Sequence, residues 1–241
     1  MTTRHAGALA LIMACIFMPV PADAIIIIDT TTFGFYNSGL GDLATDSVLG
    51  AQTDTATTFN LFPAANVSAG DPLIPPVATE PNLGGADAGT QTALGNFLGN
   101  TTALGGSWSA AAQAVPTAWA VNDETAIVYP IVVGASGFDN ILVQMGVDNG
   151  VFAWFDGTYQ FGALSPGGAS AFEYSFNTGP VSAGTHFLQL LREDHGNATG
   201  WTILADATEG TNVIPEPSTL LLLAVGTLSL LGLRGRRRRH T

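Results

Sequence analysis

Between residues 125 and 206 one kind of segment recurs, and it restricts the fold more than any other feature. Each segment is short, rich in Val, Ile, Thr and aromatic residues, and bounded by Gly, Asn, Asp or Pro. The segments are 125–133, 139–147, 150–162, 171–179, 184–194 and 200–206. Turn signals about every ten residues are typical of an antiparallel β-sandwich or barrel. We therefore predict an all-β sandwich.

Side-chain alternation and turn residues favour the same fold. Phe172, Tyr174 and Phe176 are separated by polar residues, so a strand would place all three on one face. Asp148-Asn149-Gly150 and Asp156-Gly157 are residues that adopt positive φ, and we expect a tight hairpin at each. No amphipathic helical pattern of ordinary length is present, which argues against a βαβ fold.

Two upstream stretches differ from these segments. The stretch IIIIDTTTFGFYNSG, residues 25–39, begins with four isoleucines and predicts a buried strand followed by a turn. Residues 62–107 mix proline with glycine, alanine, asparagine and threonine. We predict a long irregular insertion on the surface there, with a short helix near residues 90–98.

The N-terminal residues 1–24 have the order of a cleaved secretory signal. Arg4 precedes an apolar run over residues 6–18, and Ala22-Asp23-Ala24 follows. An uncleaved anchor is the weaker alternative because the run is too short to span about 30 Å of hydrocarbon. A minor alternative is a lipoprotein acylated at Cys15, the only cysteine. After cleavage at Ala24 the mature chain would have no thiol and no disulfide.

Charge separates the body from the two ends. Residues 25–212 contain seventeen acids and one arginine, Arg192, which gives a net charge of −16. Such a surface repels nucleic acid and anionic lipid, because both require Lys or Arg to neutralise phosphate. It is compatible with divalent cations and with neutral or cationic polymers. We exclude a nucleic-acid-binding function.

The body offers few signs of catalysis. It has no nucleophile elbow and no paired-histidine zinc spacing, and His186 within a predicted strand is expected to be structural. Two carboxylates across a cleft could hydrolyse a glycoside, so a secreted hydrolase is the alternative function. We expect that the chain is not an enzyme and holds no cofactor, with calcium as an alternative.

Two polar stretches are candidates for a ligand or calcium. Carboxylate and amide oxygens near one hairpin suit Ca²⁺, although a hairpin needs the same residues without a metal, and we favour the turn. The polar stretch 192–197 could form a binding rim, but we favour a solvated hairpin loop. The candidate residues are Asp148, Asn149, Trp154, Asp156, Asp194 and His195.

The C-terminal residues 213–241 combine a proline motif, an apolar segment and a basic end. The predicted membrane helix, 219–233, contains a 14-residue apolar run that is about 21 Å long as a helix, shorter than the hydrocarbon core. The arginines would keep the C-terminus in the cytoplasm. This pattern suits a transient anchor that is held for processing, and a weak permanent anchor is the alternative.

The same residues resemble the PEP-CTERM sorting signal of Gram-negative bacteria. The resemblance rests on Ile214-Pro215-Glu216-Pro217-Ser218, the leucine-rich segment and the terminal arginines. It implies export by the Sec machinery, recognition by a membrane-embedded exosortase and removal of the tail near the motif. It also implies association with exopolysaccharide and biofilm. The basic stop consists of Arg234, Arg236, Arg237, Arg238 and Arg239.

A second resemblance covers residues 108–207, which are similar to galactose-binding-like jelly-roll domains that precede such tails. The similar stretches are GVDNGVFAWFDG, GTHFL and DHGNATG, with His186 in place of the usual asparagine. The resemblance implies carbohydrate binding through the loops around 148–156 and 192–199. We therefore expect a signal peptide (1–24), a jelly-roll-like body (25–212) and a sorting signal (213–241) of an exported surface or matrix protein.

Overall fold

The structure is a computed structural model of the full chain, and it describes residues 24–41, 80–121, 123–165, 169–194 and 198–210. The chain divides into two compact units, Met1–Gly210 and Thr211–Thr241, and every described residue belongs to the first. The expected signal helix and the C-terminal membrane helix at 219–233 fall on residues that are not described. Among the described residues, no helix is both long enough and apolar enough to span a bilayer.

The body is all-β, as the sequence predicts, and every strand pairing in the described residues is antiparallel. Its one described α-helix, α2, is short and follows a 3₁₀ turn, η2. The elements are β1 (Ala24–Ile28), β2 (Phe33–Gly41), η2 (Leu83–Gly85), α2 (Ala88–Leu94), β3 (Gln113–Ala114), β4 (Glu124–Val133), β5 (Phe138–Phe155), β6 (Thr158–Ser165), β7 (Tyr174–Asn177), β8 (Gly184–Glu193) and β9 (Gly200–Glu209).

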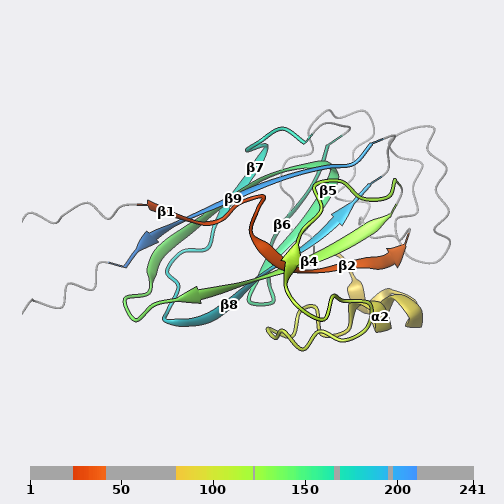
Figure 1. Cartoon of the computed structure of the whole chain (residues 1–241), viewed down its shortest axis with the longest axis horizontal. Coiled ribbons are helices and arrows are strands. Elements are labelled where there is room, and N and C mark those ends of the chain that lie inside the picture. The colour runs from red at the N-terminus through yellow and green to blue at the C-terminus, as the bar shows by residue number, and fades with distance from the viewer. Residues whose placement is uncertain (1–23, 42–79, 122, 166–168, 195–197, 211–241) are drawn as a thin grey trace, which may run out of the picture. The chain divides into compact units, whose positions relative to one another are not determined.

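Strand β5 belongs to two sheets (Figure 1). Its first part pairs with β9, from Phe138 to Asp148, and also with β7. Its last part pairs with β8 from Gly150 to Phe155 and with β6 from Asn149 to Phe155. The order along the main path is β1-β9-β5-β8-β4-β2-β3, with β6 and β7 attached to β5. One long strand therefore joins the two antiparallel sheets.

The hairpin predicted at Asp148-Asn149-Gly150 is not formed. Strand β5 runs through these residues without reversing, because the residues on both sides of them have their own ladder partners. The chain changes sheet at this point, and a glycine within a strand is typical of such a bend. The hairpin predicted at Asp156-Gly157 is confirmed, with φ of +49° and +70°.

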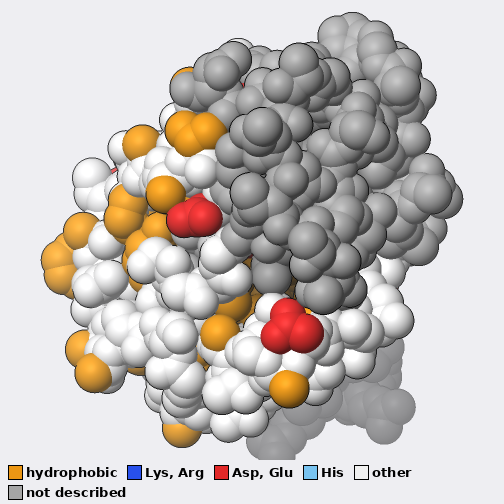
Figure 2. Space-filling model, turned by 90° about the vertical axis from the view of Figure 1, so that its right-hand side faces the viewer, with side chains coloured by type: hydrophobic (Ala, Val, Ile, Leu, Met, Phe, Trp, Pro, Cys, Tyr) orange, Lys and Arg blue, Asp and Glu red, His pale blue; other side chains and the backbone are white. Residues whose placement is uncertain are grey.

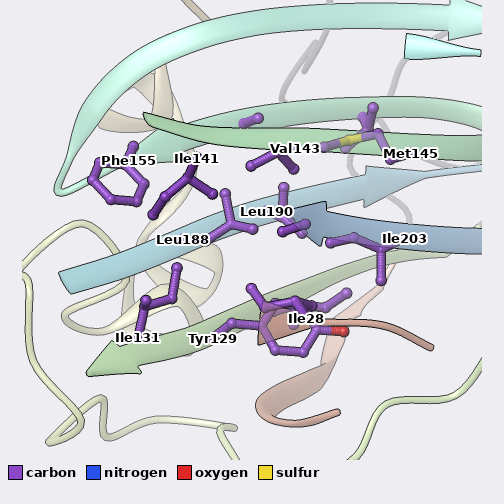
Figure 3. Close-up of a cluster of buried hydrophobic side chains, with 14 of the residues drawn as sticks. Ile28, Tyr129, Ile131, Ile141, Val143, Met145, Phe155, Leu188, Leu190 and Ile203 are labelled. Atoms are coloured by element: carbon purple, nitrogen blue, oxygen red, sulfur yellow. The ribbon is translucent and has the colours of Figure 1, made fainter. Parts of the chain in front are cut away.

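The main hydrophobic core lies between the two sheets (Figure 3). Alternate residues of each strand point into it, as the period-two pleat requires. From one sheet come Ile141, Val143 and Met145 of β5, and from the other come Leu188 and Leu190 of β8, all at most 1% exposed. Burial of this apolar surface is the main term that stabilises the body.

The isoleucine-rich strand β1 is less buried than predicted. Ile28 is 1% exposed, but Ile26 is 64% exposed. Within the described sheet, β1 is an end strand that pairs with β9 alone, so one side and one face lack a covering layer. A continuous apolar run predicts burial on both faces, which an edge position does not provide.

Residues 80–108 also differ from the predicted surface insertion. Their apolar side chains form a second core cluster against the outer face of the sheet that contains β4, β5 and β8. Phe97 lies between Trp108, stacked at 5.7 Å, and Trp154, edge-on at 5.5 Å. The short helix α2 beside β2 is confirmed near its predicted place (Figure 1).

Candidate functional site

The residues predicted to bind a ligand or calcium do not form one site. Asp148 lies where β5 changes sheet, and Asp156 lies in the turn after β5. Seven residues of β5 lie between the two, which corresponds to about 26 Å along an extended strand, so the two carboxylates are too far apart to share an ion. His195 and the side chain of Asn149 fall outside what the structure describes.

Trp154 is fully buried and presents no ring face to a ligand. Its indole Nε1 donates to Glu80 Oε1 at 2.6 Å, and its ring packs against Tyr159 at 5.6 Å. Three of the four tryptophans of the body are buried, and Trp119 is partly buried against the core. Most tryptophans of the body therefore belong to the core.

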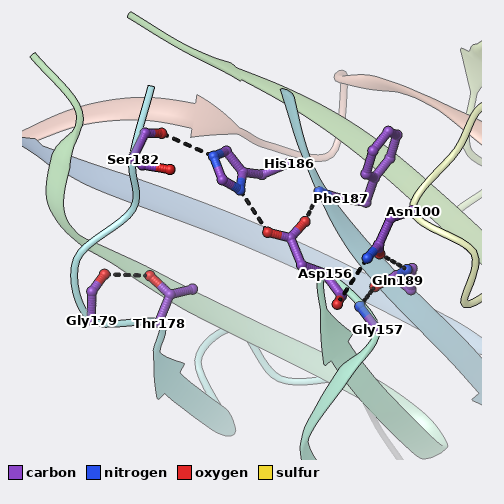
Figure 4. A network of polar contacts seen from close by, with 9 residues as sticks. All are labelled: Asn100, Asp156, Gly157, Thr178, Gly179, Ser182, His186, Phe187 and Gln189. Atoms are coloured by element: carbon purple, nitrogen blue, oxygen red, sulfur yellow. Dashed lines mark hydrogen bonds and ion pairs between the residues drawn. The ribbon is translucent and has the colours of Figure 1, made fainter. Parts of the chain in front are cut away.

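Asp156 is the centre of a polar network that ties the β5–β6 turn to β8 (Figure 4). Its Oδ1 accepts the Phe187 N–H at 2.8 Å, and its Oδ2 lies 2.6 Å from His186 Nδ1. The other ring nitrogen of His186 lies 2.9 Å from the Ser182 carbonyl oxygen, and the ring stacks on Phe155. This geometry supports the structural role predicted for His186.

The same network continues to the segment around Asn100. Gln189, fully buried, accepts the Gly157 N–H at 3.0 Å and donates to Asn100 Oδ1 at 3.1 Å. Asn100 in turn donates to the Asp156 carbonyl oxygen at 3.1 Å. Three chain segments are therefore locked together by polar side chains whose bonds are mutually satisfied, so this cluster stabilises the body instead of presenting a site.

Arg192, the single cation of the body, is fully buried. Its guanidinium carbon lies 4.2 Å from the Trp119 ring centre and 5.3 Å from that of Trp201. Nε donates to Thr125 Oγ1 at 3.0 Å. Burial lowers the pKa of Arg192 to about 10. A charge held between aromatic faces is stabilised by cation–π attraction.

The prediction of a solvated loop at residues 192–197 is wrong for residues 192–194, the part that the structure describes. Arg192, Glu193 and Asp194 are each 0% exposed. Glu193 ends β8 next to Gly150, and by register Glu124 faces it from β4. In the described residues no group of three or more acidic, histidine or cysteine side chains is placed to hold a metal ion.

Burial of Arg192 leaves the described surface without basic side chains. On the face shown in Figure 2, the described atoms are acidic, apolar or neutral, and no lysine or arginine atom is visible. An anionic ligand would therefore meet no side-chain cation on this face, which agrees with the exclusion of nucleic acid.

A pocket of about 300 Å³ opens on the outer face of the sheet formed by β5 and β9. We call it the Phe172 pocket. The strands contribute its floor, the β1–β2 turn one wall, and the segment before β7 the other wall. Its lining residues are Asp29, Thr30, Gln144, Ala171, Phe172, Thr202, Ile203 and Leu204.

The segment 169–173, which we call the strap, carries Phe172 over this pocket. Two strand glycines seat the strap, since a Cβ on Gly146 would overlap the Ser170 carbonyl oxygen and one on Gly200 would lie 2.9 Å from Ala169 Cβ. Phe172 was predicted to share a face with Tyr174 and Phe176. It lies before β7 with a φ of +69° and is 55% exposed, so that prediction was wrong.

Sequence reasoning missed this pocket because its residues are distant along the chain. Asp29 and Thr30 form a turn, Gln144 lies in mid-strand, and Phe172 looked like a core residue. One signal was available. Gly146 interrupts an apolar strand, and an isolated glycine there marks a close approach of another backbone.

Comparison with known proteins identifies the C-terminal end of the chain. The family model of the PEP-CTERM protein-sorting motif matches residues 213–239. No curated protein matches the chain. The resemblance predicted from Pro215-Glu216-Pro217 is thus confirmed. The motif implies an exported protein that an exosortase sorts to the cell envelope or surface.

Proposed function

We propose that the chain is a surface or extracellular-matrix protein whose β-sandwich body, jelly-roll-like in its topology, associates with neutral exopolysaccharide in a biofilm. The match of the sorting motif at 213–239 carries the proposal, because it assigns export and processing. The charge of the body supports the choice of polymer. A net charge of −16 with Arg192 buried disfavours anionic polymers and is compatible with neutral or cationic ones, of which we propose the neutral class.

In this proposal the tail is a transient inner-membrane anchor. The signal at 1–24 directs Sec export, the apolar segment 219–233 holds the precursor, and Arg234, Arg236, Arg237, Arg238 and Arg239 stop transfer. The exosortase then cleaves near Pro215-Glu216-Pro217-Ser218 and releases or re-anchors the body. The chain is a substrate of that enzyme and needs no cofactor of its own. A calcium-dependent rise in the melting temperature of the chain would contradict the proposal that it needs no cofactor.

Cell fractionation with intact-mass analysis tests the processing step. In a strain with the exosortase, the exported protein should lose the mass of the residues beyond the motif. In a strain without it, the full tail should stay in the membrane fraction. Glu216→Ala should block the loss of mass, while Glu209→Ala, an exposed glutamate in β9, should not. An uncleaved tail in both strains would overturn the sorting mechanism.

Co-sedimentation of the exported protein with purified exopolysaccharide tests the association. We expect the body to pellet with the polymer at physiological salt. The alternative function, a secreted hydrolase, predicts release of reducing ends from the same polymer. Glycoside hydrolysis commonly takes two carboxylates, whereas Asp29 is the single carboxylate that lines the Phe172 pocket. The leading proposal expects no reducing ends above the protein-free control, and their release would favour the hydrolase.

A further inference from the structure

Phe172 has two unfavourable features that the packing of the body does not explain. Its φ of +69° is a conformation that bulky residues rarely adopt. Its ring is 55% exposed, so burial of the ring does not compensate the strain. Backbone strain of this kind collects at positions that contact ligands. The residue therefore points to a function of the pocket that it lines.

The strap holds this ring in a defined place over the pocket. On one side of Phe172, Ser170 rests on Gly146 of β5. On the other side, Glu173 Oε2 accepts the Val147 N–H at 3.4 Å. The backbone on both sides of Phe172 is thus anchored to β5 before any ligand arrives, which limits the backbone entropy that binding must remove.

Three polar groups around the pocket keep unused hydrogen-bonding capacity. The donors from Thr31 and Thr32 all reach Asp29 Oδ1, and no described donor reaches Oδ2. The Gln144 amide makes no hydrogen bond within the described residues. Thr202 Oγ1 is buried there, also without a described partner. The Asp29 carboxylate and the Gln144 amide reach solvent, so hydroxyl groups of a ligand could replace the water bound there.

The charge and volume of the pocket restrict the class of ligand further. No lysine or arginine lines it, and Asp29 repels anions, so phosphorylated or acidic ligands are disfavoured. A cation would use acceptors alone, whereas the amide and hydroxyls here both donate and accept. A volume of about 300 Å³ is at the small end of ligand sites.

We propose that the Phe172 pocket binds a single pyranose ring of a neutral saccharide. The apolar C–H face of the sugar would lie on the Phe172 ring, and its hydroxyls would reach Asp29 Oδ2 and the Gln144 amide. The inference rests on the proposed association with neutral polysaccharide and names the site responsible for it.

Saturation-transfer NMR on the exported protein tests this site, with methyl β-galactopyranoside, methyl α-glucopyranoside and methyl α-mannopyranoside as probes. At least one sugar should receive transfer through its ring protons. Phe172→Gly removes the ring and relieves the positive φ, so binding should weaken about tenfold or more while the melting temperature does not fall. Phe172→Tyr should retain binding. Phe33→Ala, at another exposed phenylalanine outside the pocket, should not change it.

Each other outcome overturns the inference. If the wild type binds a sugar and Phe172→Gly binds it equally, the pocket is not the site, although co-sedimentation with polysaccharide still stands. If none of the three sugars shows saturation transfer, the pocket does not bind a saccharide. The co-sedimentation experiment tests the proposed function separately. Saturation transfer to choline, a cationic probe, but to none of the sugars would show that the pocket binds a cation.

Discussion

At the scale of single residues, the position of Arg192 is the least expected feature. A lone cation in an acidic body would ordinarily lie at the surface in an ion pair. Here it lies among Tyr36, Trp119 and Trp201, and its Nη1 donates to the Pro116 carbonyl oxygen at 2.9 Å. The flat guanidinium can stack and bond at the same time, which an ammonium cannot do.

Arg192→Lys should therefore destabilise the body although it keeps the charge. Loss of stacking and of the bonds to Thr125 and Pro116 should lower the free energy of unfolding by about 2–3 kcal/mol. Urea denaturation measures this difference. Thr125→Ser retains a hydroxyl acceptor for Nε and serves as the control, with a smaller loss. An unchanged urea midpoint in Arg192→Lys would show that the aromatic cage contributes nothing.

Tyr129 predicts how stability depends on alkaline pH. Burial raises the pKa of Tyr129 to about 12 from 10, so the folded chain keeps a proton that the unfolded chain releases. The resulting stabilisation is fully present below pH 10 and is lost as pH rises toward 12, by about 2 kcal/mol. Urea midpoints at pH 8, 10 and 11.5 should fall less steeply in Tyr129→Phe. Parallel curves for the two proteins would contradict the assignment.

At the scale of elements, the strap and the β5–β6 turn depend on particular backbone positions. Gly146 lets the strap lie on β5, and Asp156 holds the turn after β5 at a φ of +49°. Gly146 and Asp156 bury little apolar area, yet each determines how two neighbouring elements pack against one another. Both can be tested with matched glycine and alanine variants.

Gly146→Ala should displace the strap. The new methyl group overlaps the Ser170 carbonyl oxygen, so overpacking should cost about 1–3 kcal/mol. Binding at the Phe172 pocket should be lost in the same variant. Gly134→Ala is the control, because nothing lies within 4 Å of a Cβ there. Equal melting temperatures for the two variants would contradict the seating of the strap on Gly146.

Asp156→Ala and Asp156→Gly should separate bonding from strain in the turn. Both variants lose the carboxylate that accepts from Phe187 and contacts His186. Only alanine also keeps a Cβ at positive φ, which adds about 1 kcal/mol of strain. Asp156→Ala should therefore be the less stable variant, as thermal unfolding would measure. The reverse order would show that the turn is not strained at this position.

At the scale of the whole molecule, the body has its own core. The buried residues of both clusters lie between Ile28 and Ala207, within the unit Met1–Gly210. Removal of residues 211–241 should therefore leave the melting temperature of the exported body unchanged within about 2 °C. Differential scanning calorimetry on the truncated and full-length proteins measures this. A drop of about 5 °C or more would mean that the tail stabilises the body.

The strands were predictable because their signal is local. Alternation and turn residues lie within ten residues of each other, so 125–133 and 184–194 correspond closely to β4 and β8. The site was not predictable in the same way. Trp154 and Asp156 are close in sequence, but one is covered by residues near Glu80 and the other by His186. Burial depends on which distant segment packs over a residue.

The sequence alone determined the strand composition, the acidic body and the sorting motif, because propensity, charge and a contiguous motif are properties of short stretches. Tertiary structure decided which of these residues are exposed. It carried β5 through Asp148-Asn149-Gly150 into a second sheet and buried Arg192 between aromatic rings. It also brought Asp29, Gln144 and Phe172 into one pocket. The reason is that pairing in an antiparallel sheet joins residues far apart in the chain, and no local pattern records their partners.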